Sequence, residues 1–403
     1  MNNPRNGTAQ NHRSAKAMMC PLNPPNGRET PTFPSPWFPQ EIIGEILSNL
    51  SVKSLVRFRC VSKSLKSLIS DPVFIKKHLN RTQNDPKLSK KRVLMKTSST
   101  QNPDRCSIKS FNLSDTNEDS IVNTTEFEYP STEVSRNDMI VGSCNGLICI
   151  AVREYKFFLV NPALRVFKKL PSLCIEVYTV YGFGFVASED DYKVVRVFCY
   201  SNKTVEDGYM GLVTVYSLRD NYWRRIDDMP YRAPANQVMK HVDGTLNWSA
   251  YRGRDTGSYI IVSLDLAHET YREVMQPCYG DDEADRRILG VLDGCLCLLC
   301  DYWRRSCADL WVMKEYGKRE SWTLLVSLSC NAVPRNACFG TPLFVSGSGE
   351  IWLCFGKDCI EYNPKEDVFR ILEIPDFADS SICPPAHVYE ESLVSPIAFD
   401  HHR

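Results

Sequence analysis

The stretch Asn145-Gly146-Leu147-Ile148-Cys149-Ile150 puts a glycine turn directly before a run of apolar residues. An Asn-Gly pair next to apolar, β-branched residues is typical of a tight turn that leads into a buried β-strand. The same order occurs three more times, in Asp243-Gly244-Thr245-Leu246-Asn247-Trp248, Asp293-Gly294-Cys295-Leu296-Cys297-Leu298 and Ser348-Gly349-Glu350-Ile351-Trp352-Leu353. Four turns of one kind indicate a repeated β-structure.

A second pattern accompanies these turns. A strand ends at a small polar residue, a turn follows, and an aromatic residue comes six positions later. The pairs are Asn161 and Phe167, Ser217 and Trp223, Asp265 and Tyr271, and Asn363 and Phe369, while Trp322 is the matching aromatic after a longer turn through Tyr316-Gly317. The five aromatics are separated by 56, 48, 51 and 47 residues. This spacing matches the kelch-type propeller period of about 50 residues better than the WD-type period of about 40 to 45.

The repeats predict an all-β, kelch-like β-propeller over residues 136–395. Each unit supplies one sheet that is too small to bury its own face, and radial stacking of neighbouring sheets makes the core continuous. Alternating apolar residues such as Val213 and Val215 support sheets that pack on one another. Five units are visible, and a sixth could come from Tyr181–Val197 or from the stretch before Val141, so blade number and ring closure stay open. A β-sandwich whose strand pairs recur by chance is the alternative.

A helical pattern precedes the repeats, in residues 36–80. Ile42, Ile46 and Leu50 share one stripe at helical spacing, and further apolar residues follow until Asp71-Pro72. The pattern predicts a small all-α module of three short helices, whose core is below the size that is comfortable alone. Part of its apolar surface should therefore be covered by a partner or by the neighbouring domain.

The remaining segments are polar. Residues 1–35 contain six prolines and predict a disordered tail. Residues 81–135 predict a linker with some ordered structure, and residues 396–403 predict a C-terminal tail.

The composition excludes several classes of partner. The chain has 48 Lys and Arg and 48 Asp and Glu, without a long block of one sign, which argues against a nucleic-acid footprint or a membrane surface patch. The best apolar run, Ile288–Cys300, contains Asp293 and is too short to cross a bilayer. The first 36 residues lack a secretory signal pattern, and the 17 cysteines follow no disulfide framework, so we expect the cytosol or the nucleus.

No residue pattern predicts catalysis, a metal site or a cofactor. Cys297 and Cys300 have a metal-like spacing, but tetrahedral zinc needs four ligands and no second Cys or His pair follows closely. The segment Gly182-Phe183-Gly184 lacks the third glycine and the helix of a phosphate-binding loop. Cys278 and His241 could meet in space, although nothing in their spacing favours it. We assign no catalytic residue, no metal ligand and no cofactor.

The helical module resembles the F-box. The residues that carry the resemblance are Phe38-Pro39-x-Glu41-Ile42-Ile43-x-Glu45-Ile46-Leu47-x-x-Leu50, Val52-Lys53-Ser54-Leu55-x-Arg57-Phe58-Arg59-Cys60-Val61-Ser62-Lys63 and Leu68-Ile69-Ser70-Asp71-Pro72-x-Phe74. Phe38 and Leu65 stand where the family usually has leucine and tryptophan, and both remain apolar. The resemblance implies docking on a Skp-family adaptor and through it on a cullin. By resemblance, the residues that make this contact are Phe38, Pro39, Ile42, Ile46, Leu50, Leu55 and Val61.

The repeat region resembles the F-box-associated domain, type 1, of plant F-box proteins with kelch-like repeats. The residues that carry this resemblance are Gly142-Ser143-Cys144-Asn145-Gly146-Leu147-Ile148, Leu159-Val160-Asn161-Pro162, Tyr181-Gly182-Phe183-Gly184-Phe185, Asp190-Asp191-Tyr192-Lys193-Val194-Val195-Arg196, and Tyr216-Ser217-Leu218 leading to Trp223. Together the two resemblances imply a non-catalytic substrate-recognition subunit of a Skp-cullin-F-box ubiquitin ligase. Such a subunit recruits a target protein, whose identity the sequence does not give, for ubiquitination and degradation. We expect it to bind no nucleic acid and to insert into no membrane.

Loops at one face of the propeller are the expected place of target capture. The candidate polar stretches are residues 201–210, 251–258, 280–287 and 302–306. Tyr302, Trp303, Arg304 and Arg305 are the strongest candidates, because Trp, Tyr and Arg are enriched at binding hot spots. The alternative function is a kelch-like propeller enzyme or small-ligand-binding protein whose helices serve dimerisation. That function would need convergent His, Cys or carboxylate side chains at the ring centre.

Overall fold

The computed structural model describes residues 39–85, 90–98, 106–112, 124–127, 134, 137–153, 156–172, 179–201, 209–234, 237–252, 259–279, 284–302, 304–329, 340–355, 358–372, 374–375 and 386–398. Phe38, Trp303, the predicted tail at residues 1–35 and residues 399–403 therefore lie outside the described residues.

Four helices open the described chain: α1 (Gln40–Ser48), α2 (Val52–Phe58), α3 (Lys63–Ile69) and α4 (Pro72–Asn84). The sequence pattern predicts three helices that stop at Asp71-Pro72, whereas the structure begins a fourth helix there. Asp71 Oδ1 accepts hydrogen bonds from the backbone N–H of Val73 (2.8 Å) and Phe74 (3.2 Å), so Asp71 is an N-cap. Pro72 suits the first helical turn because it needs no hydrogen-bond donor there. Helix α3 thus ends at Ile69 with Ser70 as its C-cap, and Asp71-Pro72 starts α4 instead of closing the helical module.

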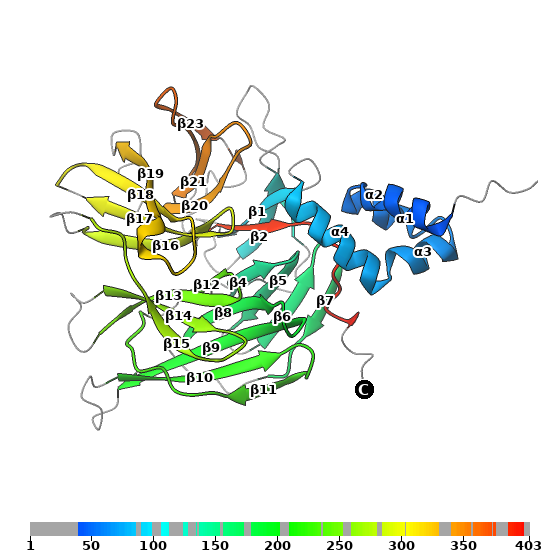
Figure 1. Ribbon diagram of the computed structural model, residues 1–403, viewed down its shortest axis with the longest axis horizontal. Coiled ribbons are helices and arrows are strands. Elements are labelled where there is room, and N and C mark those ends of the chain that lie inside the picture. The colour runs from blue at the N-terminus through cyan, green and yellow to red at the C-terminus, as the bar shows by residue number, and fades with distance from the viewer. Residues whose placement is uncertain are drawn as a thin grey trace, which may run out of the picture. The chain divides into compact units, whose positions relative to one another are not determined.

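The described β-structure consists of six four-stranded antiparallel sheets, so the predicted all-β propeller after an all-α module is confirmed. Figure 1 shows the sheets arranged around a common centre. In sheet order, the strands are β24 (His387–Glu390), β1 (Lys91–Ser98), β2 (Cys106–Asn112) and β3 (Thr125–Glu126); β4 (Met139–Cys144), β5 (Leu147–Val152), β6 (Lys156–Asn161) and β7 (Val166–Lys169); β8 (Thr179–Val186), β9 (Asp191–Ser201), β10 (Tyr209–Ser217) and β11 (Tyr222–Arg225); β12 (Lys240–Val242), β13 (Thr245–Tyr251), β14 (Tyr259–Asp265) and β15 (Tyr271–Val274); β16 (Arg286–Leu292), β17 (Cys295–Tyr302), β18 (Cys307–Met313) and β19 (Trp322–Ser329); β20 (Gly340–Val345), β21 (Ile351–Phe355), β22 (Asp358–Asn363) and β23 (Val368–Leu372).

The first strand of each sheet lies at the centre of the ring. Strands β4, β8, β12, β16, β20 and β24 contact one another in a cycle, β24 returning to β4. The four glycine turns of the sequence all join a first strand to a second strand. In three of them both turn residues have positive φ, for example Asn145 at 51° and Gly146 at 77°. That geometry suits the right-handed twist of paired strands.

In four of the sheets, a polar residue at the end of the third strand holds the turn into the fourth strand. Asn161 Oδ1 accepts hydrogen bonds from the backbone N–H of Ala163 (2.9 Å) and Leu164 (3.2 Å). Asp265 and Asn363 make the equivalent pair of bonds in their own sheets. All five aromatics of the second sequence pattern accordingly lie on fourth strands, namely β7, β11, β15, β19 and β23.

The sixth sheet combines the two ends of the propeller chain. Strand β24 pairs with β1, with Leu94 opposite His387. The stretch before Val141 therefore supplies the sixth sheet, whereas Tyr181–Val197 belongs to the sheet of Trp223. The segment 81–135, where the sequence predicts a linker with some ordered structure, contains β1, β2 and β3 of this sheet.

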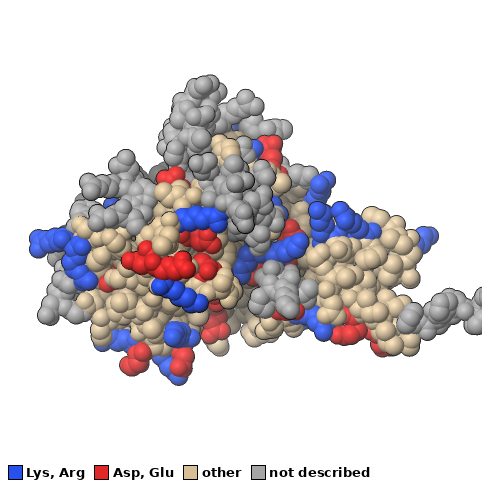
Figure 2. All heavy atoms as spheres, turned by 90° about the horizontal axis from the view of Figure 1, so that it is seen from above, with Lys and Arg blue, Asp and Glu red and all other residues tan. Residues whose placement is uncertain are grey.

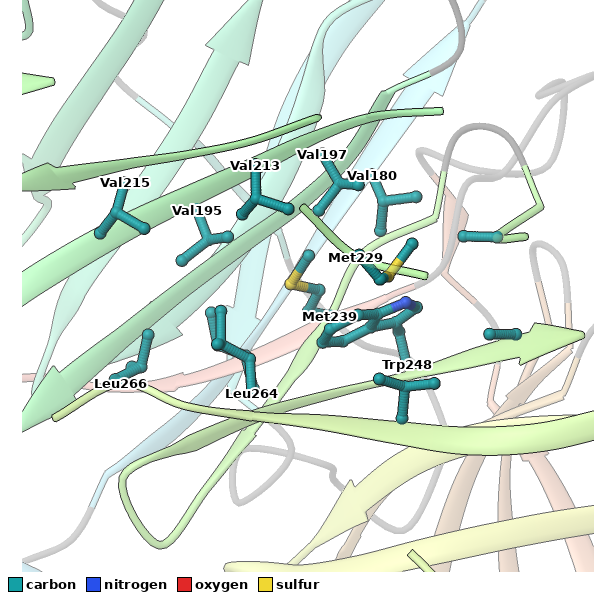
Figure 3. Close-up of a cluster of buried hydrophobic side chains, with 14 of the residues drawn as sticks. Val180, Val195, Val197, Val213, Val215, Met229, Met239, Trp248, Leu264 and Leu266 are labelled. Atoms are coloured by element: carbon teal, nitrogen blue, oxygen red, sulfur yellow. The ribbon is translucent and has the colours of Figure 1, made fainter. Parts of the chain in front are cut away.

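Apolar side chains fill the space between neighbouring sheets. Figure 3 shows one such cluster, in which valines of β8, β9 and β10 face Trp248, Leu264 and Leu266 of the next sheet. Trp248 is 1% exposed. Two other clusters, one on each face, explain why β17 has a near-continuous apolar sequence, because both of its faces are covered.

Candidate functional site

The helical module keeps a small core and leaves large apolar side chains in solvent. Its buried apolar residues are Leu47, Val52, Leu55, Ile69 and Phe74. Its exposed ones are Ile42, Ile46, Phe58, Val61 and Val73, of which Ile46 is 56%, Val61 68% and Val73 77% exposed. Exposure of so much apolar surface to water is unfavourable for a helical unit of this size, so the exposed set is a candidate protein-binding surface.

The structure separates the predicted docking residues by burial. Pro39, Ile42, Ile46 and Val61 are exposed and Leu50 is half-buried. Leu55 is fully buried, so it supports the helices from inside. The family pattern alone does not single out Phe58 and Val73, which the structure exposes. The position of Val73 on the side of α4 away from its buried residues is a signal that could have found it, whereas Phe58 is only three residues from buried Leu55 and its exposure depends on how the helices pack.

Electrostatic contacts hold α1 and the loop after it to α4. The Glu45 carboxylate pairs with the Lys77 ammonium and the Arg81 guanidinium, and both hydrogen bonds lower the pKa of Glu45. The His78 ring, which is buried, bonds through Nε2 to the carbonyl oxygen of Leu50 (2.9 Å). Burial lowers the pKa of His78, so the ring is neutral at physiological pH.

Helix α4 also contacts the turns that join first and second strands. Gln83 Nε2 donates to Asn145 Oδ1 (3.0 Å), and Lys76 Nζ lies 3.7 Å from Asp190 Oδ1. Ile75 and Leu79 pack against the apolar cluster between the sheets of β4 and β8. These contacts all involve the edge of the sheets at which first strands end.

The strand ends that border the predicted target-binding stretches lie at the opposite edge. Residues 201–210, 251–258 and 302–306 follow the second strands β9, β13 and β17, and residues 280–287 lead into the first strand β16. Antiparallel pairing places the start of a first strand beside the end of its second strand, as Arg286 lies opposite Asp301. The described strand ends that border all four stretches therefore lie at one face of the sheets, while residues 202–208, 253–258, 280–283 and 303 lie outside the described residues.

The described part of this face carries arginine and tyrosine side chains in contact. Tyr302 is buried, while Arg304 and Arg305 are exposed, and the Arg305 guanidinium lies 4.8 Å from the Tyr302 ring centre. The Arg287 guanidinium lies 5.2 Å and 5.3 Å from the ring centres of two further tyrosines, Tyr259 and Tyr279. Arg287 belongs to the predicted stretch 280–287, whereas sequence reasoning missed Tyr259 and Tyr279, each of which directly borders a predicted stretch.

Positive and negative side chains are interspersed on the face of the molecule that Figure 2 displays. In the described part of the chain, no group of three or more His, Cys, Asp or Glu side chains is arranged to hold a metal ion. None of the helices in the described ranges is both long and apolar enough to cross a membrane.

The Cys and His side chains that do meet are not the pair considered from the sequence. Cys278 is exposed, and His241 instead lies beside Cys144, with 3.7 Å between His241 Nδ1 and Cys144 Sγ. The His241 Nε2 contacts the backbone of Phe185. Burial raises the pKa of the Cys144 thiol to about 12, so the nucleophilic thiolate is scarce at neutral pH.

The fold and the helical surface define a class: a six-bladed β-propeller with an F-box-like helical module before it. Residues 36–77 match the family model of the F-box domain, and residues 96–396 match that of the F-box associated beta propeller domain. The chain belongs to this family of F-box proteins with an associated propeller.

Two relatives from Arabidopsis thaliana illustrate the match. An F-box/kelch-repeat protein is 32% identical over 372 residues, which cover 89% of this chain and 95% of the relative. The F-box protein CPR1 is 29% identical over 337 residues, which cover 76% of this chain and 77% of CPR1. Among solved structures, an oligogalacturonate lyase in complex with manganese aligns with a TM-score of 0.39 and 10% identity, covering 66% of this chain and 70% of the lyase.

Proposed function

We propose that this chain is the substrate-recognition subunit of a Skp-cullin-F-box ubiquitin ligase. Its helices dock on a Skp-family adaptor and through it on a cullin, and its propeller binds a target protein. The chain itself performs no chemistry, because holding a target lysine near the ubiquitin-loaded enzyme raises the effective concentration of the two reacting groups. We place this activity in the cytosol or the nucleus.

The observation that carries the proposal is the exposed apolar set on the helical module. Pro39, Ile42, Ile46 and Val61 belong to the family's docking pattern and are exposed, while Leu50 is half-buried. Phe58 and Val73 extend the same surface chemistry. Burial of these side chains against an apolar partner would remove them from water.

The test is capture of a purified Skp-family adaptor by the full chain. Ile46→Asp should weaken binding at least about 100-fold, because docking would bury a carboxylate without a counter-ion. The side chain is already exposed in the free chain, so the fold should tolerate the change. Leu50→Asp should act in the same direction.

Met275→Asp is the matched control, since Met275 is 54% exposed and lies just after β15 of the propeller. It should capture the adaptor like the unmodified chain. Unchanged capture by Ile46→Asp would contradict the ligase role. In cells, the Ile46→Asp chain should retain its target without directing its degradation, which makes it the bait of choice for isolating that target.

For the target, we propose the propeller face that carries the loops after the second strands. Tyr302, Trp303, Arg304 and Arg305 are the proposed contact residues. The contact of the Arg305 guanidinium with the Tyr302 ring supports this proposal. An exposed guanidinium that lies over an aromatic ring is partly ordered before binding. The strand ends that border these loops lie at the edge of the sheets away from the turns that α4 contacts, so a target there would not compete with those contacts.

A further inference from the structure

Two basic residues lie on opposite inner strands of the propeller. Lys240 lies on β12 and His387 on β24, and both strands belong to the inner ring. The sheets of β12 and β24 are three positions apart in a ring of six, so they are opposite each other. Both strands also contact β4, which carries the small residues Gly142 and Ser143.

The two groups are close enough to interact. The charge of Lys240 contributes to the low pKa of His387, which burial and this charge together bring to about 3. Burial also lowers the pKa of Lys240. Both side chains are nevertheless half-buried rather than fully enclosed, so solvent reaches them although their strands are innermost.

Neither side chain is compensated by a partner among the described residues. No hydrogen bond and no ion pair joins the Lys240 ammonium or the His387 ring to any of them. The neighbour of Lys240 is the thiol of Cys297, and burial raises the pKa of that thiol to about 12. A neutral thiol gives Lys240 no counter-charge.

The rest of the inner ring is also biased toward positive charge. Within the bounds of its six strands, the basic and histidine side chains are Lys240, His241, Arg286, Arg287 and His387, and the one carboxylate is that of Glu390. Glu390 is three residues beyond His387 on β24, about 10 Å along the strand. Arg286 lies 3.9 Å from Asp301, Arg287 lies over the Tyr259 and Tyr279 rings, and His241 contacts Cys144 and Phe185. Lys240 and His387 are left without such a contact among the described residues.

We propose that the axis of the propeller binds a small oxyanion, the phosphate or carboxylate group of a compact molecule, between Lys240 and His387. The oxyanion supplies the counter-charge of the Lys240 ammonium, and it accepts hydrogen bonds from Lys240 and from the neutral His387 ring that the described protein groups do not accept. Converging basic groups with few carboxylates nearby favour anions over cations at this point. The site does not depend on the ligase role of the chain.

The experiment is thermal unfolding of the full chain with added inorganic phosphate or malonate, at ionic strength held constant with sodium chloride. At least one of the two anions should raise the unfolding temperature along a saturable curve, because a ligand that binds only the folded state stabilises it. A response to phosphate alone assigns a phosphate group, and a response to malonate alone assigns a carboxylate.

Lys240→Met should weaken the apparent affinity about 10-fold or more, because it removes a charge-assisted hydrogen bond. His387→Gln is the second variant and should also weaken it. Lys169→Met is the control, since Lys169 is exposed on the outermost strand β7. The proposal is overturned if neither anion gives a saturable shift beyond chloride, or if Lys240→Met and His387→Gln respond like the unmodified chain.

Discussion

Asn161 performs two tasks that its sequence position reveals only in part. Its Oδ1 holds the local turn, as Asn363 Oδ1 does in another sheet. Its Nδ2 additionally donates to the backbone carbonyls of Ser392 (3.0 Å) and Val394 (2.6 Å). Asn161 is fully buried, so it joins the first complete blade to the C-terminal segment.

Asn161→Ala should therefore cost more than Asn363→Ala. We expect a loss of about 3 kcal/mol in the free energy of unfolding for Asn161→Ala. The substitution removes the hydrogen-bond donor of two buried carbonyls, and it also removes the acceptor that holds the turn. Asn363→Ala should cost about 1 kcal/mol, since only the turn bonds are lost. Urea unfolding followed by tryptophan fluorescence measures both values, and equal losses would show that the contacts to the C-terminal segment contribute nothing.

Glycine turns that look alike in sequence have different surroundings. Gly146 and Gly244 both have positive φ, 77° and 70°. A Cβ on Gly146 would lie 2.6 Å from Ser392 Cβ and 2.8 Å from the Glu390 carbonyl oxygen. A Cβ on Gly244 would meet nothing within 4 Å. The turn between β4 and β5 is thus also a packing surface for the C-terminal segment.

Gly244→Ala should destabilise the propeller by about 1 kcal/mol, the cost of the left-handed backbone conformation for a residue with Cβ. Gly146→Ala should cost at least about 3 kcal/mol, since it adds steric overlap with backbone that cannot move freely. Calorimetric unfolding of the two variants provides the comparison. A difference of less than about 1 kcal/mol would mean that the C-terminal segment shifts at little cost.

At the scale of the whole molecule, the ring is closed by residues from both ends of the propeller chain. Strand β24 is the inner strand of the sheet that β1, β2 and β3 complete. Ser143 Oγ donates to the Val388 carbonyl oxygen (2.5 Å), and Ser392 Oγ donates to that of Asn145 (2.6 Å), so the closing strand is held to the next sheet as well.

Removal of residues 386–403 should abolish cooperative unfolding of the propeller, because it leaves an inner sheet edge and two apolar sheet faces uncovered. A chain shortened only by residues 399–403 keeps every contact described for β24 and should unfold like the full chain. Differential scanning calorimetry distinguishes the two chains. A normal transition in the shorter one would mean that the other five sheets are stable as an open ring.

The repeat unit and the helical module could be read from the sequence because their signals are local. Asn145-Gly146 sets a turn through its own backbone preferences, and the helical stripe of Ile42, Ile46 and Leu50 needs only neighbours four residues apart. Family resemblance added the docking set, yet it could not tell exposed Ile46 from buried Leu55. Burial depends on how the helices pack, and the motif does not encode that directly.

By itself, then, the sequence determined the kind of repeat, its period and the helices that precede it, since each rests on contacts within a few residues. Only the tertiary structure decided that β24 pairs with β1, that Cys144 rather than Cys278 meets His241, and that Lys240 and His387 lie on opposite inner strands. These partners are far apart in the chain. Their meeting depends on the number of sheets and on how the ring closes, and no short stretch of residues carries that information.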